Sequence, residues 1–184
     1  MEDLVKHQDF KSEPICQNHK DTHMNIFVVP GSESSSPKER EEVYLLTSYN
    51  KNISVFQCHD KQYLYNLSIE NREMACSRQH RNKFFVGTFC DTLFMFIYDH
   101  MSRKLILSSE MRTHESIISI AVLTNELLIC GQSNGYLDTI TCKPSKKTPG
   151  EFRLDNVASN FCSNLGYINC IQVCNKASSD DQQQ

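Results

Sequence analysis

Short apolar runs alternate with polar turns along most of this 184-residue chain. The runs are rich in Val, Ile, Phe, Tyr and Thr, and they recur about every 8–12 residues, which is typical of β-strands joined by turns. No uninterrupted stretch has the 3.6-residue period of an amphipathic helix. We therefore predict an all-β protein with strands at residues 25–29, 43–49, 53–58, 63–69, 74–78, 84–89, 93–98, 104–110, 117–123, 127–131, 136–142, 151–154 and 168–174.

The pattern of strands repeats along the chain. The segments VYLLTSYNKNISVFQ, KFFVGTFCDTLFMFI and ELLICGQSNGYLDTI align, and their second strands open at Ile53, Leu93 and Leu137, at intervals of 40 and 44 residues. Four strands in about 40–45 residues is the period of a β-propeller blade, whose two faces pack against neighbouring blades. We predict three four-stranded antiparallel blades at residues 24–70, 72–110 and 114–154, and an orphan strand at 168–174.

Residues 114–141 (HESIISIAVLTNELLICGQSNGYLDTIT) resemble a WD40 repeat. His114 precedes an inner strand of alternating apolar residues, and a second strand then leads into a tight turn. Asn134-Gly135 predicts a type I′ hairpin, in which both central residues have positive φ. The resemblance covers about residues 24–174. It implies a WD40-type propeller, a fold that holds other proteins.

The resemblance is divergent, because the chain has no Trp and no Gly-His opening. Tyr98-Asp99 stands where the family has Trp-Asp. In the family the His, an Asp in the turn, a Ser or Thr and the Trp form one hydrogen-bonded network. Here His114 could pair with Asn134 or Ser133 at most.

Three blades are fewer than the 4–8 of closed propellers, so apolar faces are exposed at both ends. We expect one of three outcomes: another chain completes the ring, the sequence is a segment of a longer product, or the open fragment associates with itself. The orphan strand favours truncation.

Composition narrows the function. The net charge of −3 and a pI near 6.2 provide no basic field for nucleic acid or anionic lipid. The N-terminus lacks the apolar core of a signal peptide, and no apolar run reaches the roughly 18–20 residues that span a bilayer. The nine scattered cysteines fit a reducing compartment. We predict a cytoplasmic protein with a polar N-terminal arm at residues 1–23 and a polar tail at 175–184.

The candidate chemistry is sparse. Cys16, His19 and His23 have a spacing compatible with zinc ligands, but the later cysteine pairs of a B-box-like module are missing. We interpret them as part of a polar arm and keep a zinc module as the alternative. No nucleophile-elbow, P-loop, kinase or HExxH motif is present, so we predict neither an enzyme nor a cofactor. The carboxylates Asp91, Asp99 and Asp138 are assigned to turns and hydrogen bonds.

The main hypothesis is a non-catalytic scaffold that presents loops and blade faces to protein partners. Most of the strand aromatics pack between blades under this hypothesis, and one or two face a partner; they are Tyr63, Tyr65, Phe85, Tyr98 and Tyr136. The alternative is a regulatory WD40-like segment of a larger enzyme, of the kinase or ubiquitin-ligase type.

Overall fold

The computed structural model describes residues 23–29, 42–49, 52–59, 62–70, 72–145, 151–162 and 166–173. Every regular element within these ranges is a β-strand, which confirms the predicted all-β class. No helix in the described part of the chain is long and apolar enough to cross a membrane.

In the described part of the chain, twelve strands form three antiparallel four-stranded sheets, in each of which neighbours in the chain are neighbours in the sheet. The first sheet contains β1 (His23–Val29), β2 (Glu42–Tyr49), β3 (Asn52–Gln57) and β4 (Gln62–Ser68). The second contains β5 (Met74–His80), β6 (Lys83–Thr88), β7 (Thr92–Asp99) and β8 (Lys104–Arg112). The third contains β9 (Ile117–Val122), β10 (Leu127–Gln132), β11 (Tyr136–Pro144) and β12 (Phe152–Phe161).

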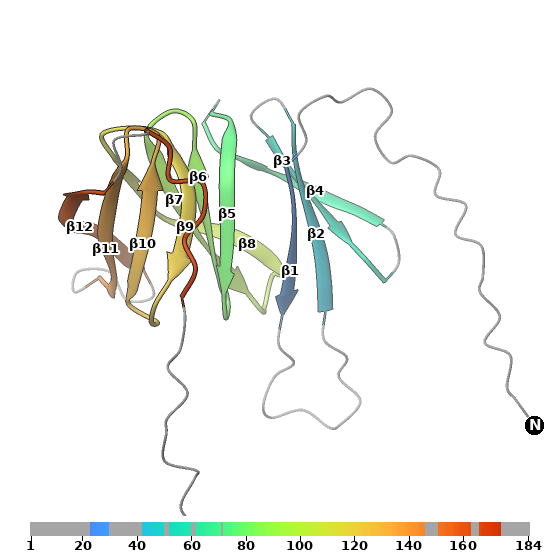
Figure 1. The fold of residues 1–184 in the computed structure, drawn as a ribbon. Coiled ribbons are helices and arrows are strands. Elements are labelled where there is room, and N and C mark those ends of the chain that lie inside the picture. Colours follow the sequence, from blue (N-terminus) through green and yellow to red (C-terminus); the bar gives the residue numbers. More distant parts are fainter. Residues whose placement is uncertain are drawn as a thin grey trace, which may run out of the picture.

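The three sheets stand side by side, with the second between the other two (Figure 1). β1 and β5, the first strands of the first and second sheets, are linked through the side chain of Gln79 on β5. Its Nε2 donates to the carbonyl of Val28 on β1 at 2.5 Å, and its Oε1 accepts from the N–H of Val28 at 2.9 Å. β8 and β12, the last strands of the second and third sheets, are also linked, since the backbone N–H of Phe152 on β12 donates to Ser108 Oγ on β8 at 3.3 Å.

The core consists of two apolar layers, one on each face of the second sheet. Phe84 and Phe94 face the first sheet, whereas Phe85 and Met95 face the third. Successive side chains of a strand point to opposite faces, and both faces are covered here. All six residues of β6 are therefore buried, including Lys83.

The third sheet packs tightly against the second at Gly87 on β6. A Cβ atom there would lie 2.7 Å from Ile117 Cγ2 and 2.8 Å from Cys76 Sγ, closer than the ordinary 3.4–4 Å. The Cys76 thiol donates to the carbonyl of Ile117 at 3.3 Å. The absence of a side chain at residue 87 allows this approach.

The hairpin between β10 and β11 differs from the prediction. Gly135 has φ of +86°, but Asn134 is not among the positive-φ residues, so the turn is not type I′. The N–H of Gly135 bonds to the carbonyl of Gln132 at 3.3 Å, which makes Ser133 and Asn134 the central residues of the turn. Gly135, the last residue of this turn, takes the left-handed conformation, and Asn134 does not.

Two strand predictions also differ. The strand predicted at 151–154 extends to Phe161, because β12 pairs along the whole of β11. Residues 168–173 of the strand predicted at 168–174 carry no strand assignment, and residue 174 lies outside the described ranges. No strand of the described residues forms a ladder with this segment.

Candidate functional site

Part of the alternative zinc module lies outside the described residues. Cys16 and His19 belong to that part, and His23 is the first residue of β1. Within the described ranges, no group of three or more His, Cys, Asp or Glu side chains could hold a metal ion.

Tyr98 and Asp99 end β7 and act separately. The Tyr98 ring is buried, and its hydroxyl is 2.9 Å from that of Tyr44, which links the second sheet to the first. Asp99 instead orders the turn after β7, where its carboxylate accepts hydrogen bonds from the Ser102 hydroxyl and from the backbone N–H groups of Met101 and Ser102. The Ser102 hydroxyl is the main cause that holds the pKa of Asp99 below its ordinary 3.8.

The His114 ring lies exposed before β9, and it makes no hydrogen bond within the described part of the chain. Neither pairing considered for it, with Asn134 or with Ser133, is formed. The third sheet instead contains a buried carboxylate, that of Asp138, which accepts hydrogen bonds from Gln132 Nε2 and, at 2.5 Å, from Ser159 Oγ. Asp138 therefore has a structural, hydrogen-bonded role in this sheet.

The candidate aromatics divide into packing and surface residues. Phe85 and Tyr98 are buried between sheets, and the Tyr65 hydroxyl accepts a hydrogen bond from the Leu105 N–H at 2.8 Å. Tyr63 and Tyr136 are 50% and 39% exposed. These two remain available to a partner.

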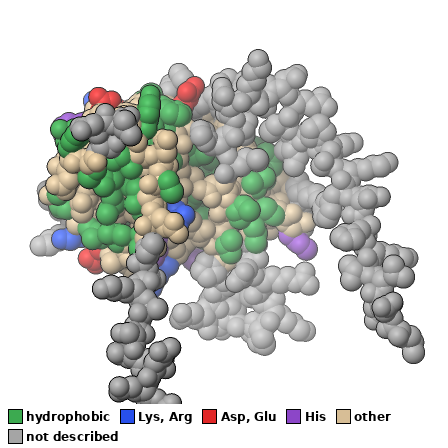
Figure 2. All heavy atoms as spheres, viewed as in Figure 1, with side chains coloured by type: hydrophobic (Ala, Val, Ile, Leu, Met, Phe, Trp, Pro, Cys, Tyr) green, Lys and Arg blue, Asp and Glu red, His purple; other side chains and the backbone are tan. Residues whose placement is uncertain are grey.

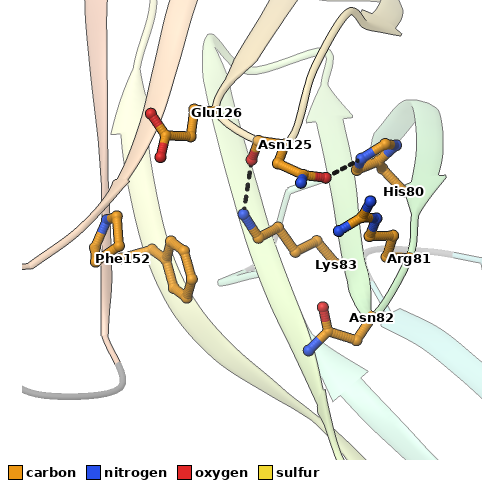
Figure 3. Close-up of a pocket in the computed structure, with 8 residues that line it drawn as sticks. His80, Arg81, Asn82, Lys83, Asn125, Glu126 and Phe152 are labelled. Atoms are coloured by element: carbon orange, nitrogen blue, oxygen red, sulfur yellow. Dashed lines mark hydrogen bonds between the residues drawn. The ribbon is translucent and has the colours of Figure 1, made fainter. Parts of the chain in front are cut away.

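A pocket of about 240 Å³ opens where two turns meet, one between β5 and β6 and the other between β9 and β10 (Figure 3). We call it the rim pocket. Its lining residues are His80, Arg81, Asn82, Lys83, Asn125, Glu126, Pro144 and Phe152.

Lys83 forms the inner wall of the rim pocket and is only 9% exposed. Its ammonium donates to the carbonyl of Asn125 at 2.8 Å and lies 4.2 Å from the centroid of the Phe152 ring, a cation–π contact. The Cys142 sulfur, a weak acceptor, is 3.7 Å away. No carboxylate in the described part of the chain forms an ion pair with Lys83.

The mouth of the pocket carries charges of both signs. His80 Nε2 is 2.7 Å from Asn125 Oδ1, which ties the two turns together. Arg81 is exposed and, within the described ranges, forms no ion pair; neither does Glu126. Figure 3 shows Lys83 extending across the pocket toward Asn125, with Glu126 and Phe152 on the far side.

Three thiols of the second and third sheets have raised pKa values, and one of them, Cys142, lies beside Lys83. Burial raises the pKa of Cys142, although the Lys83 ammonium opposes that effect. Burial also raises the pKa of Cys76 to about 12 and that of Cys130 well above its ordinary value. The thiolate is the nucleophilic form, so none of the three is activated.

The rim pocket is not among the sites predicted from the sequence. Its walls come from turns more than 40 residues apart, and only the packing of two sheets brings them together. The available signal was the polar turn His80-Arg81-Asn82-Lys83 between two apolar strands.

A second surface lies on the outer side of the third sheet, where residues 166–173 follow β9 and β10 (Figure 1). We call them the end segment. A Cβ atom at Gly131 would lie 2.7 Å from Ile168 Cγ2, and Ser119 Oγ donates to the carbonyl of Ile168 at 2.5 Å. This contact repeats the one in which Gly87 meets Ile117 and Cys76 donates to its carbonyl.

The end segment therefore lies where the first strand of a fourth sheet would lie. Its Ile168 N–H bonds to the carbonyl of Gln132 at 3.4 Å. Tyr167 and Val173 are 66% and 42% exposed. Hydrophobic side chains gather on the face of the third sheet seen in Figure 2.

Comparisons with known proteins give a structural match but no sequence match. No protein-family model and no curated protein matches the sequence. The described structure is similar to Hsv2p of Kluyveromyces lactis, a WD40 β-propeller protein from yeast, with a TM-score of 0.51 and 14% identity. The match covers 64% of this chain and 43% of Hsv2p, so this chain spans less than half the length of that protein. At this identity the likeness supports a β-propeller fold for the three sheets.

Proposed function

We propose that this chain forms three blades of a WD40-type β-propeller and acts as a non-catalytic scaffold that holds other proteins. The repeat intervals of 40 and 44 residues, the meander order within each sheet and the likeness to a propeller structure support the blade assignment. Propeller blades are rigid, and their turns can present side chains to partners.

The end segment is the observation that carries the proposal. It repeats, on the outer face of the third sheet, the contact by which the third sheet joins the second. Among the described residues no strand pairs with the end segment, and such an unpaired edge readily pairs with another chain.

The end segment pairs with β-strands of another chain under this proposal. Main-chain hydrogen bonds along the end segment would be completed by strands of a partner protein or of a second copy of this chain. Either arrangement would also cover Tyr167 and Val173, which are exposed.

Other features agree with a non-catalytic, cytoplasmic protein. The seven described cysteines are free thiols, as a reducing compartment favours. Burial raises the pKa of Cys76 and Cys130, which disfavours the nucleophilic thiolate. The net charge of −3 supports protein partners over nucleic acid or anionic membranes.

Sedimentation velocity over a wide concentration range tests the proposal. We expect the wild-type chain to exceed its monomer mass of 21.2 kDa as its concentration rises. Val173→Asp places a charge on the end segment and should suppress this association. Val157→Asp is the matched control, because Val157 is 57% exposed on β12, away from that segment.

If the wild-type chain stays a compact monomer at every concentration and unfolds cooperatively, the end segment does not need a partner strand, and the proposal loses its support. Equal effects of the two substitutions would mean that association does not use the end segment.

A further inference from the structure

We propose that the rim pocket binds a carboxylate side chain in an acidic segment of a partner protein, with Lys83 as the internal cation and Arg81 at the mouth. This inference rests on the proposed scaffold function, since it takes the ligand to be part of a protein. It specifies the chemical class of the ligand, a carboxylate, for one binding site on the scaffold.

The first argument is the incomplete neutralisation of Lys83. An ammonium group has three donors, and among the described residues the carbonyl of Asn125 is the one strong acceptor that Lys83 contacts. The other contacts are the Phe152 ring at 4.2 Å and the Cys142 sulfur at 3.7 Å. A buried cation without an anionic partner is costly, whereas an added carboxylate would form a charge-assisted hydrogen bond.

The second argument is the shape and position of the site. The rim pocket holds about 240 Å³ and is open at the junction of two turns, where a peptide could reach it from solvent. Arg81 has φ of +55°, so the backbone bends sharply at the mouth, and its guanidinium forms no ion pair among the described residues. A guanidinium there could bind the same carboxylate or its neighbour.

Charge favours a carboxylate over a phosphate group. Glu126 belongs to the lining, and its negative charge would oppose any anion that enters. A phosphorylated side chain carries about −1.5 to −2 charges near pH 7, so Glu126 would repel it more strongly than a singly charged carboxylate. The Phe152 ring also provides an apolar wall for the methylene groups of a Glu side chain.

Peptide titrations followed by ¹H–¹⁵N NMR test the inference on the full chain. The probes are acetyl-tetraglutamate amide, the matched acetyl-tetraglutamine amide, and inorganic phosphate. We expect the glutamate peptide to shift the amide signals of Lys83, Asn125 and Phe152, and the glutamine peptide to leave them unchanged. Binding should weaken as salt is added.

Three variants locate the binding site. Lys83→Met keeps the length of the side chain and removes its charge, and we expect binding about ten-fold weaker or more, as for loss of one charge-assisted hydrogen bond. Arg81→Gln changes an exposed residue, so it tests the mouth even if Lys83→Met does not fold. Lys104→Met is the control, because Lys104 also lies over an aromatic ring, that of Tyr65 at 5.8 Å, but outside the pocket.

The inference is wrong if the glutamate peptide gives no shifts in the pocket, or if Lys104→Met weakens binding as much as Lys83→Met. Phosphate binding without peptide binding would overturn the ligand class. If the wild-type chain associates through the end segment but does not bind the glutamate peptide, this inference is wrong and the proposed function stands. A monomeric wild-type chain in sedimentation would instead count against the proposed function.

Discussion

Replacing Gly87 by alanine adds a methyl group where the second and third sheets leave no room for one. The new Cβ would lie 2.7 Å from Ile117 Cγ2, 2.8 Å from Cys76 Sγ and 2.9 Å from Ile117 Cβ. The Cys76 sulfur can rotate away. Ile117 Cβ is attached directly to the backbone of β9, and its side chain is fully buried, so the strand itself must shift.

The expected loss of stability follows from two opposing effects. Overpacking a core contact typically costs about 1–3 kcal/mol. Alanine also restricts the unfolded chain, which returns about 0.4–1 kcal/mol. We therefore expect Gly87→Ala to lower the free energy of unfolding by about 1–2 kcal/mol, measured by urea unfolding followed by circular dichroism with an unchanged m-value.

Gly131→Ala is the matched comparison. Its Cβ would also meet atoms at 2.5–2.9 Å, but these belong to Ser119 and to Ile168 of the end segment, which has no strand ladder. The end segment can move away, so the change in unfolding free energy should stay within about 0.5 kcal/mol, while amide exchange at Ile168 rises. A Gly87→Ala protein with an unchanged or higher urea midpoint would refute this reasoning.

Three further predictions concern buried and turn groups. Tyr44→Phe removes the 2.9 Å hydroxyl contact with Tyr98 in the core, and thermal unfolding should show a loss of about 1 kcal/mol; an unchanged thermal midpoint would contradict a stabilising role for this contact. Cys76 is partly buried, and desolvation raises the pKa of its thiol to about 12, so it should resist a thiol reagent at pH 8 until the protein unfolds, whereas exposed thiols react at once; fast native labelling at Cys76 would contradict that raised pKa. Ser102→Ala should raise the carboxyl pKa of Asp99 toward 3.8, as read by NMR titration. Because the pKa of Asp99 is lowered in the folded state, its stabilising effect is present above the unfolded pKa and is lost as pH falls through the folded pKa; an unchanged titration in Ser102→Ala would refute the role of that hydroxyl.

The positions of the strands were predictable because strand formation depends on a local pattern. Alternation of apolar and polar residues predicted twelve of the strands to within a few residues at most ends, and the 40- and 44-residue intervals predicted their grouping in fours. The turn at Asn134-Gly135 was the local exception. A dipeptide preference does not specify how many residues the turn contains, and here the hydrogen bond from Gly135 to Gln132 sets that number.

The candidate sites were less predictable, because they depend on contacts between distant segments. Nothing in the sequence shows that Asn125 accepts a hydrogen bond from Lys83, or that Phe152 lies beside it. The resemblance to WD40 repeats suggested a network around His114, yet that ring is exposed, and Gln132 and Ser159 bind Asp138 instead.

The sequence by itself therefore determined the secondary structure and the repeat, since both follow from residue spacing along one chain. Only the tertiary structure decided which face each strand buries and where pockets form. Phe84 and Phe85 are neighbours of the same type, yet they face different sheets. Ile117 and Ile168 make the same contact with a glycine, yet only Ile117 lies in a paired strand. The physical reason is that burial and pairing are properties of the neighbours that surround a residue, and the stacking of the sheets supplies those neighbours.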